Sequence, residues 1–259
     1  MRLLVKVEVE NRLGIVTIQN PPLNVMSKQV IEELDQAFQE LETNEEVVAV
    51  LLTGQGQKAF VAGADIKEFP QLMGHPHARA SFEETHAVLN RIDDFRKPTI
   101  VALNGMAFGG GLELALTCDM RIAEEHALLC VPEVKLGLFP GAGGTQRLPR
   151  VVGEAKAKEM MYTGEPITAE EALRVGLVNY VVGTGEAVDK AKALASKITR
   201  HSLQSLSRIK KAVDDGLGVP LKEGLQREVE LFEEVFQTDD IKEGVSAFIE
   251  KRQPVFSHK

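Results

Sequence analysis

The chain has 259 residues, 44% of them hydrophobic and 26% charged, a composition that excludes a disordered, collagen-like or fibrous protein. Its 30 basic and 38 acidic side chains give a formal net charge of −8, and no concentrated basic segment is present that would bind a nucleic acid. The longest mostly apolar stretch, residues 106–118, contains Glu113, and the first ten residues carry four charges, so we expect a cytoplasmic protein without a transmembrane helix or signal peptide.

The first fifty residues predict two strands, a helix and a buried strand. Hydrophobic and charged residues alternate over 3–10, and an apolar segment follows at 14–18, so two strands are expected there. Residues 20–24 interrupt regular structure, because two prolines in this segment lack N–H donors. Ser27 predicts the N-cap of a helix with one apolar face. The continuous apolar run 47–52 is typical of a strand buried on both faces.

The same order of elements recurs in the middle of the chain. A turn at Gly63 leads into a short helix from Asp65, and a longer helix is expected over 81–95. Residues 98–103 predict another buried strand, after which the glycines at 109–111 open another helix. This repetition predicts an α/β core built of strand–strand–helix units.

The chain turns mostly helical from about residue 151. Short strands are expected before this point at 120–123 and 127–131, and the last strand is expected at 177–182. Three amphipathic helices follow, over 204–217, 221–236 and 239–251. We therefore predict a core over residues 1–200 and a helical C-terminal region over 201–259, without a sharp linker between them.

Several familiar site motifs are absent from the sequence. It contains no G-x-x-x-x-G-K-[ST] phosphate loop and no G-x-S-x-G nucleophile elbow. Residues 141–146 begin like a dinucleotide fingerprint, but Gln146 stands where the last glycine should be and Pro140 precedes the segment instead of a strand. His75 and His77 could bind a metal, but a solvated loop is the better interpretation of their Gly/Pro-containing segment. We therefore expect no metal site.

Two glycine-containing turns are candidates for holding an anion. The glycines at 109–111 begin a helix, and the free N–H groups of a helix's first turn attract negative charge, although a flexible turn explains this segment equally well. Ala64 lies in a similar turn, and N–H groups from two such turns form an oxyanion hole if they converge. Asp65 has a simpler interpretation as the N-cap of the helix that follows it.

Two glutamates in apolar surroundings are candidates for proton transfer. Glu113 lies on a predicted helix whose other residues are apolar or small, so its carboxyl group is either desolvated, paired, or exposed on an otherwise core-facing helix. Glu133 follows Val131 and Pro132 in a second apolar segment. Two such carboxylates beside a glycine-rich helix start indicate acid–base chemistry next to an enolate-like anion. The residues themselves do not name the substrate.

These residues resemble the crotonase family, the enoyl-CoA hydratase/isomerase superfamily, over nearly the whole chain. The matching segments occur in order and with matching spacing, at residues 20–24, 62–67, 97–98, 104–105, 109–113, 132–133, 140–147 and 246–252. The resemblance implies an α/β spiral of ββα repeats with a helical C-terminal region that drives trimerisation. The expected assembly is a homo-oligomer, as a trimer or a dimer of trimers.

The resemblance also implies roles for individual residues. The N–H groups of Ala64 and Gly110 are expected to form the oxyanion hole for the thioester carbonyl, and Gly141 to offer its N–H to the attacking water. The coenzyme A site is expected to involve Ala62, whose backbone lies near the adenine, with Ala64, Asp65, Ile66 and Lys67. Phe248 and Lys251 match C-terminal positions that close over coenzyme A, often from a neighbouring subunit. Coenzyme A is part of the substrate, so no separate cofactor is expected.

The activity implied is that of an enoyl-CoA hydratase, since hydratases of the family carry glutamates at the positions of Glu113 and Glu133. Such an enzyme adds water reversibly to trans-2-enoyl-CoA, giving 3-hydroxyacyl-CoA in fatty-acid β-oxidation or related degradation, with Glu133 delivering the proton to C2. A Δ3-Δ2 enoyl-CoA isomerase is an alternative, because isomerases often keep only the second glutamate. A crotonase-fold RNA-binding protein is disfavoured, because such homologues carry a lysine-rich helix where residues 81–97 here mix acidic and basic side chains.

Overall fold

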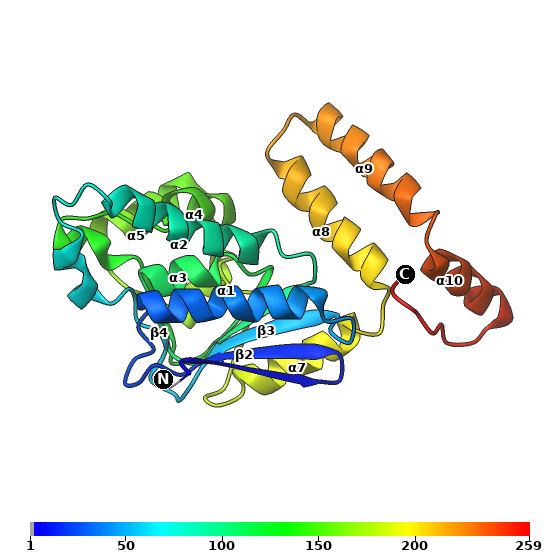
Figure 1. Ribbon diagram of the computed structural model, residues 1–259, viewed down its shortest axis with the longest axis horizontal. Helices are drawn as coiled ribbons and strands as arrows, with labels where there is room; N and C mark the ends of the chain where they lie inside the picture. Colours follow the sequence, from blue (N-terminus) through cyan, green and yellow to red (C-terminus); the bar gives the residue numbers. More distant parts are fainter. Residues whose placement is uncertain (1–2) are drawn as a thin grey trace.

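The computed structural model describes residues 3–259, and Met1 and Arg2 lie outside the described residues. The chain forms two sheets covered by helices (Figure 1). The first sheet has six strands in the spatial order β1 (Val5–Glu10), β2 (Leu13–Ile18), β3 (Ala49–Gly54), β5 (Thr99–Leu103), β7 (Met120–Glu124) and β10 (Tyr180–Val182). The second has four, in the order β4 (Ala59–Val61), β6 (Met106–Phe108), β8 (Leu128–Cys130) and β9 (Ile167–Thr168).

The strands of the first sheet follow the predicted pattern. β1 pairs antiparallel with β2, and β2, β3, β5, β7 and β10 then pair in parallel. Every residue of β3 and β5 is buried, as their continuous apolar sequences predict. The strand expected over 177–182 begins only at Tyr180. The correction has a local cause, because the N–H groups of Leu177 and Val178 both donate to the Ala172 carbonyl, at 2.8 and 3.3 Å, and so close a helix end.

Helices cover both faces of the six-stranded sheet. One apolar cluster lies between this sheet, α1 (Lys28–Thr43) and the second sheet, and another joins the opposite face to α7 (Ala187–Ile198) (Figure 1). Ser27 caps α1 by accepting from the Val30 N–H, as its sequence position predicts. The remaining helices of this part of the chain are η1 (Ile66–Gln71), α2 (Ala78–Asp93), α3 (Gly110–Ala115), η2 (Pro132–Leu136), α4 (Gly144–Val152), α5 (Glu154–Thr163) and α6 (Ala169–Arg174).

Two details differ from the sequence-based expectation. α2 was expected over 81–95 but begins at Ala78, because the segment from Ala78 to Ala80 favours helix, and it ends at Asp93. Phe95 beyond it is buried instead against Phe38, with the ring centroids 5.1 Å apart. The short strands β4, β6 and β9, of three, three and two residues, are not among the predicted elements, because an alternating pattern cannot be recognised over so few positions.

The C-terminal arm, residues 203–250, consists of α8 (Leu203–Leu217), α9 (Leu221–Val235) and α10 (Asp239–Glu250). These bounds agree to within one residue with the predicted helices. The arm extends away from the body, the part of the chain from β1 to α7 (Figure 1). α8 and α9 approach closely at Gly216 and Gly224, and an ion pair from Lys210 Nζ to Asp119 Oδ1, 2.9 Å long, joins α8 to the body. The proposed boundary at residue 200 stays a prediction.

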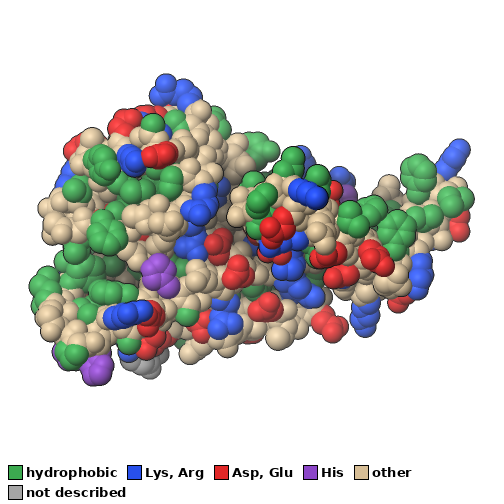
Figure 2. Space-filling model, turned by 90° about the horizontal axis from the view of Figure 1, so that it is seen from above, with side chains coloured by type: hydrophobic (Ala, Val, Ile, Leu, Met, Phe, Trp, Pro, Cys, Tyr) green, Lys and Arg blue, Asp and Glu red, His purple; other side chains and the backbone are tan. Residues whose placement is uncertain are grey.

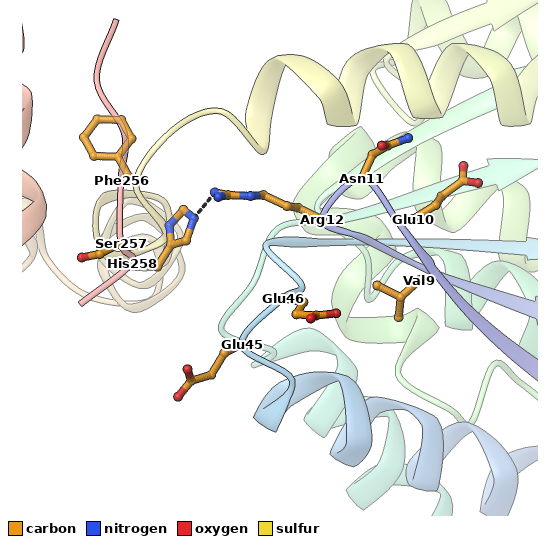
Figure 3. A pocket seen from close by; sticks show the side chains of 9 residues that line it. All are labelled: Val9, Glu10, Asn11, Arg12, Glu45, Glu46, Phe256, Ser257 and His258. Carbon is orange, nitrogen blue, oxygen red and sulfur yellow. Dashed lines mark hydrogen bonds between the residues drawn. The ribbon is translucent and has the colours of Figure 1, made fainter.

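The chain end folds back onto the body. Asp240, which is 2% exposed, accepts hydrogen bonds from the backbone N–H groups of Ser257 and His258. The His258 ring meets the Arg12 side chain at the β1–β2 turn, beside a pocket of about 550 Å³ that Glu45, Glu46 and Phe256 also line (Figure 3). Across residues 3–259, no helix has the length and apolarity needed to cross a bilayer.

Candidate active site

Glu113 lies in the interior of the protein. All six residues of α3 are buried, and Glu113 itself is only 3% exposed. Its Oε1 accepts two backbone hydrogen bonds, from the Ala142 N–H at 2.8 Å and from the Gly144 N–H at 2.7 Å. Of the alternatives open from the sequence, surface exposure is therefore excluded, and the carboxyl group is both desolvated and paired.

The surroundings of Glu113 act in opposite directions on its pKa. Burial has the largest effect and raises the pKa of Glu113 above its ordinary value. The hydrogen bonds from Gly144 and Ala142 and the positive charge of Arg147 oppose this increase. Gly144 is required at the closest contact, because a Cβ atom on it would lie 2.9 Å from Glu113 Oε1 and 2.8 Å from Pro140 Cβ. The segment 140–144 is therefore shaped to hold one oxygen of this carboxylate.

Glu133 lies in the first turn of η2, next to the start of α3. A Cβ atom added to Gly109 would lie 2.7 Å from Glu133 Oε1, so the carboxylate touches the backbone of this turn. Glu133 Oε2 is buried and has no hydrogen-bond partner among the described residues. Burial raises the pKa of Glu133 to about 7, and the nearby charge of Glu113 adds to the increase. A carboxyl group near half-protonation at neutral pH is suited to proton transfer.

The two predicted N–H donors lie next to each other. A Cβ atom on Gly110 would lie 3.7 Å from the Ala64 backbone nitrogen. Within residues 3–259 neither the Ala64 N–H nor the Gly110 N–H donates a hydrogen bond, whereas the Gly109 N–H donates to the Cys130 carbonyl at 2.9 Å. Gly109 has a φ of 50° and a ψ of −124°, a conformation that glycine adopts most readily. The geometry therefore provides two unpaired donors beside Glu133.

The turn that carries Ala64 is held by a residue that the sequence analysis did not single out. The Met26 N–H donates to the Gly63 carbonyl at 2.8 Å, and the Met26 carbonyl accepts from the Asp65 N–H at 3.1 Å. Asp65 is an N-cap, as expected, because its Oδ1 accepts from the Lys67 N–H at 3.1 Å. Met26 lies two residues after the Pro/Asn-containing segment 20–24, which is the only sign of irregular structure near it in the sequence.

The other residues of the segment 62–67 lie at the surface end of this turn. The Ala62 N–H donates to the Leu23 carbonyl at 3.1 Å, so its carbonyl is the backbone group left to contact a ligand. Ile66 and Lys67 are exposed. Gly141 is also exposed, and its N–H donates no hydrogen bond to the part of the chain that the structure describes.

Phe248 and Lys251 do not join the other candidate residues within one chain. α10, which carries Phe248, lies at the right-hand end of the molecule, whereas α3 lies in the left half (Figure 1). The Phe248 side chain is 85% exposed. Any contact of these two residues with the site around Glu113 requires another copy of the chain.

Metal ligands do not gather in the described chain. Among residues 3–259, no group of three or more His, Cys, Asp or Glu side chains is arranged to hold a metal ion. His75 and His77 lie with their ring centroids 5.3 Å apart, and the His77 N–H donates to His75 Nδ1 at 3.2 Å, which occupies one of the two ring nitrogens of His75.

Comparison with known proteins gives one consistent family. The family model described as enoyl-CoA hydratase/isomerase matches residues 8–259. A relative from Clostridium acetobutylicum named short-chain-enoyl-CoA hydratase is 43% identical over 247 residues, covering 95% of this chain and 94% of the relative. The solved structure of an enoyl-CoA hydratase from Bacillus anthracis aligns with a TM-score of 0.94 at 38% identity, covering 99% of this chain and 100% of that one. DspI from Pseudomonas aeruginosa aligns with a TM-score of 0.93 at 40% identity, covering 97% and 96%.

Proposed function

Because the chain belongs to the enoyl-CoA hydratase/isomerase family, we propose that Glu113 and Glu133 catalyse the reversible syn addition of water to trans-2-enoyl-CoA, which gives 3-hydroxyacyl-CoA. The protein is an enoyl-CoA hydratase, a hydro-lyase with the crotonase fold that its sequence indicated. The observation that carries the mechanism is the combination of two carboxyl groups in different environments, the buried Glu113 and the half-buried Glu133, beside two unpaired backbone N–H groups.

Glu113 is the base that activates water. Its Oε1 is occupied by the Ala142 and Gly144 N–H groups, and hydrogen bonds to a carboxylate favour the ionised form. The second oxygen remains to accept a proton from water as the hydroxyl adds to C3. The free N–H of Gly141, three residues before Gly144, is the group we assign to orient that water.

Glu133 is the acid that protonates C2. With a pKa raised to about 7, its carboxyl group holds a proton at neutral pH often enough to deliver it as the hydroxyl adds. The Ala64 and Gly110 N–H groups stabilise the negative charge that develops on the thioester oxygen. Dehydration of 3-hydroxyacyl-CoA uses the same groups in the reverse direction.

The remaining assignments belong to the same proposal. Coenzyme A lies along Ala62, Ala64, Asp65, Ile66 and Lys67, with the Ala62 carbonyl accepting from the adenine amino group. Phe248 and Lys251 close over it from a neighbouring subunit of a trimer or a dimer of trimers. Support comes from the arm, where apolar side chains are exposed along α9 and at its C-cap (Figure 2): Leu221, Leu225, Val229, Phe232 and Phe236. We assign the enzyme to fatty-acid or related acyl-CoA degradation in the cytoplasm.

A rate measurement over a series of trans-2-enoyl-CoA chain lengths tests the function. Hydration removes the conjugated enone, so the enone absorbance should fall when wild-type protein is added. The chain length with the largest kcat/KM should show which acyl group the pocket fits best. The Glu133→Gln variant is the matched control. Conversion of 3-enoyl-CoA to 2-enoyl-CoA without any hydration would replace this assignment by the isomerase.

A further inference from the structure

Arg147 lies one turn into α4 and contacts the segment that holds Glu113. Its Nη1 lies 3.5 Å from the Ala142 carbonyl oxygen, at the outer limit of a hydrogen bond. A Cβ atom on Gly143 would lie 2.1 Å from the same Nη1, so the guanidinium lies directly against the Gly143 backbone. Arg147 therefore touches the backbone between the two N–H groups that bind Glu113, at the Ala142 carbonyl and at Gly143.

Gly143 can make this contact for two reasons. Its φ of 106° lies in the left-handed region, which side chains disfavour, and it has no Cβ to displace the guanidinium. Its carbonyl also accepts from the Arg147 N–H at 2.8 Å, which fixes the start of α4. Arg147 therefore contacts Gly143 twice, through the hydrogen bond from its backbone N–H and through the packing of its guanidinium.

The other side of the guanidinium is anchored to α2. Arg147 Nε donates to Asp93 Oδ2 at 2.7 Å, and Nη2 donates to Asn90 Oδ1 at 2.8 Å. The Arg147 side chain is only 15% exposed. Because a guanidinium is rigid and planar, anchoring two of its nitrogens fixes where the third one lies. α2 and the Glu113-binding segment are therefore connected through a single side chain.

We infer that Arg147 is a positioning residue for Glu113, holding the Ala142–Gly144 segment so that its two N–H groups converge on Oε1. The inference rests on the proposed function, in which Glu113 is the base. Arg147 acts through the backbone of this segment and does not touch the substrate. Its positive charge supports the same role, since it lowers the pKa of Glu113 against the effect of burial.

The test is Arg147→Gln, with Arg150→Gln as the matched control. Arg150 lies on the same helix and carries the same charge, but it donates to the Gln146 carbonyl and is exposed. Loss of positioning should lower kcat for hydration by about 10²-fold with a small change in KM, the scale known for displaced catalytic geometry. The acid limb of the kcat/KM profile should move to higher pH. Arg150→Gln should leave both unchanged.

A second readout separates positioning from a general structural role. Exchange of the C2 hydrogen of a saturated acyl-CoA in D₂O needs Glu133 and the oxyanion hole, but no activated water. Arg147→Gln should therefore reduce exchange far less than hydration. Equal losses of hydration and exchange, or no loss of hydration, would overturn the inference. If Arg147→Gln does not fold, the double variant Asn90→Ala, Asp93→Asn removes the anchors instead, and the same two outcomes apply.

A measurement without substrate keeps this inference distinguishable from the proposed function. Infrared titration of the unliganded protein, with Glu113 identified by its loss in Glu113→Gln, should show a higher pKa for Glu113 in Arg147→Gln than in wild type or Arg150→Gln. That result supports the positioning role even if wild type hydrates no enoyl-CoA, an outcome that would refute the proposed function alone. An unchanged pKa of Glu113 in Arg147→Gln would contradict the positioning role of Arg147.

Discussion

The body and the C-terminal arm differ in how their apolar side chains are covered. In α3 every residue from Gly110 to Ala115 is buried, and Glu113 is enclosed with them. In α9, Leu221–Val235, Leu231 is the one buried residue, while Phe232 beside it is 63% exposed. The body completes its core within one chain, whereas the arm presents apolar side chains that one chain does not cover (Figure 2).

The difference indicates that the chemistry is built in the body and that the arm carries the surface for the oligomer we propose. The carboxylates and the backbone donors of the candidate active site all come from the body, between Ala64 and Gly144. The arm contributes none of them within one chain, and its exposed face has the character of an interface. Changes in the body should therefore lower the catalytic rate of an assembled protein, and changes in the arm should alter assembly first. The five predictions below test this separation, from the largest expected effect to the smallest.

The largest effect is expected from the two carboxylates of the body. Glu113→Gln and Glu133→Gln should each lower kcat for hydration by about 10²- to 10⁴-fold, the contribution of a general acid or base. The double variant should lose much less than the product of the two, because groups that act as a unit are not additive. Near-normal hydration by Glu113→Gln would contradict the two-carboxylate mechanism. The oligomeric state, measured by sedimentation, should not change.

A slightly smaller effect is expected from one donor of the oxyanion hole. Gly110→Pro removes the N–H at the first position of α3, where a helix accepts proline, and should lower kcat by about 10²- to 10³-fold. Gly110→Ala is the control, because it keeps the N–H and adds a Cβ whose nearest neighbour is the flexible Met26 methyl group at 2.8 Å. Equal rates for the two variants, with folding verified by circular dichroism, would remove Gly110 from the site.

In the arm, a charge on the exposed face should dissociate the oligomer that we propose. Phe232→Asp should weaken self-association by about 2 kcal/mol or more, as expected of a buried aromatic side chain at an interface. Sedimentation velocity should show smaller species with unchanged helical content. Glu228→Gln, on the same helix, is the control. A wild-type monomer, or a Phe232→Asp oligomer as stable as wild type, would show that α9 is not the interface.

The raised pKa of Glu133 predicts a dependence of stability on pH. Between the ordinary value of 4.5 and about 7 the folded protein binds the extra proton, so the free energy of unfolding should fall as pH rises through this range. After allowance for screening at a partly exposed side chain, the loss is about 1 to 2 kcal/mol. Glu133→Gln lacks this charge, so chemical denaturation should show it gaining stability relative to wild type from pH 4 to pH 8. A constant difference would contradict the burial argument.

The smallest effect is expected where the arm joins the body. Lys210→Met removes the ion pair to Asp119, whose carboxylate keeps its bonds from the Thr99 N–H and hydroxyl at 2.7 and 3.0 Å, so the cost should be about 1 kcal/mol. Hydrogen exchange should become faster in α8 and stay unchanged in α3. Lys211→Met, which breaks an exposed pair with Asp215, is the control. Faster exchange in α3 as well would show that the two regions are coupled.

The sequence by itself determined the order of the longer elements and the residues capable of acid–base chemistry. Ser27 marked the start of α1, the continuous apolar runs marked β3 and β5, and the glycines marked the start of α3, because caps, periodicity and turns depend on neighbouring residues. It also drew attention to Glu113 and Glu133 from their apolar neighbours. It did not indicate Met26 or Arg147, whose roles depend on partners distant in the chain.

Only the tertiary structure decided the state and setting of these groups. Glu113 is paired because Ala142 and Gly144, 29 and 31 residues away, direct their N–H groups to one of its oxygens. Glu133 has no hydrogen-bond partner for its buried oxygen among the described residues. Ala64 lies beside Gly110 because β4 and β6 pair in the second sheet. A pKa and an oxyanion hole depend on distances in space, and local sequence patterns carry no information about those distances.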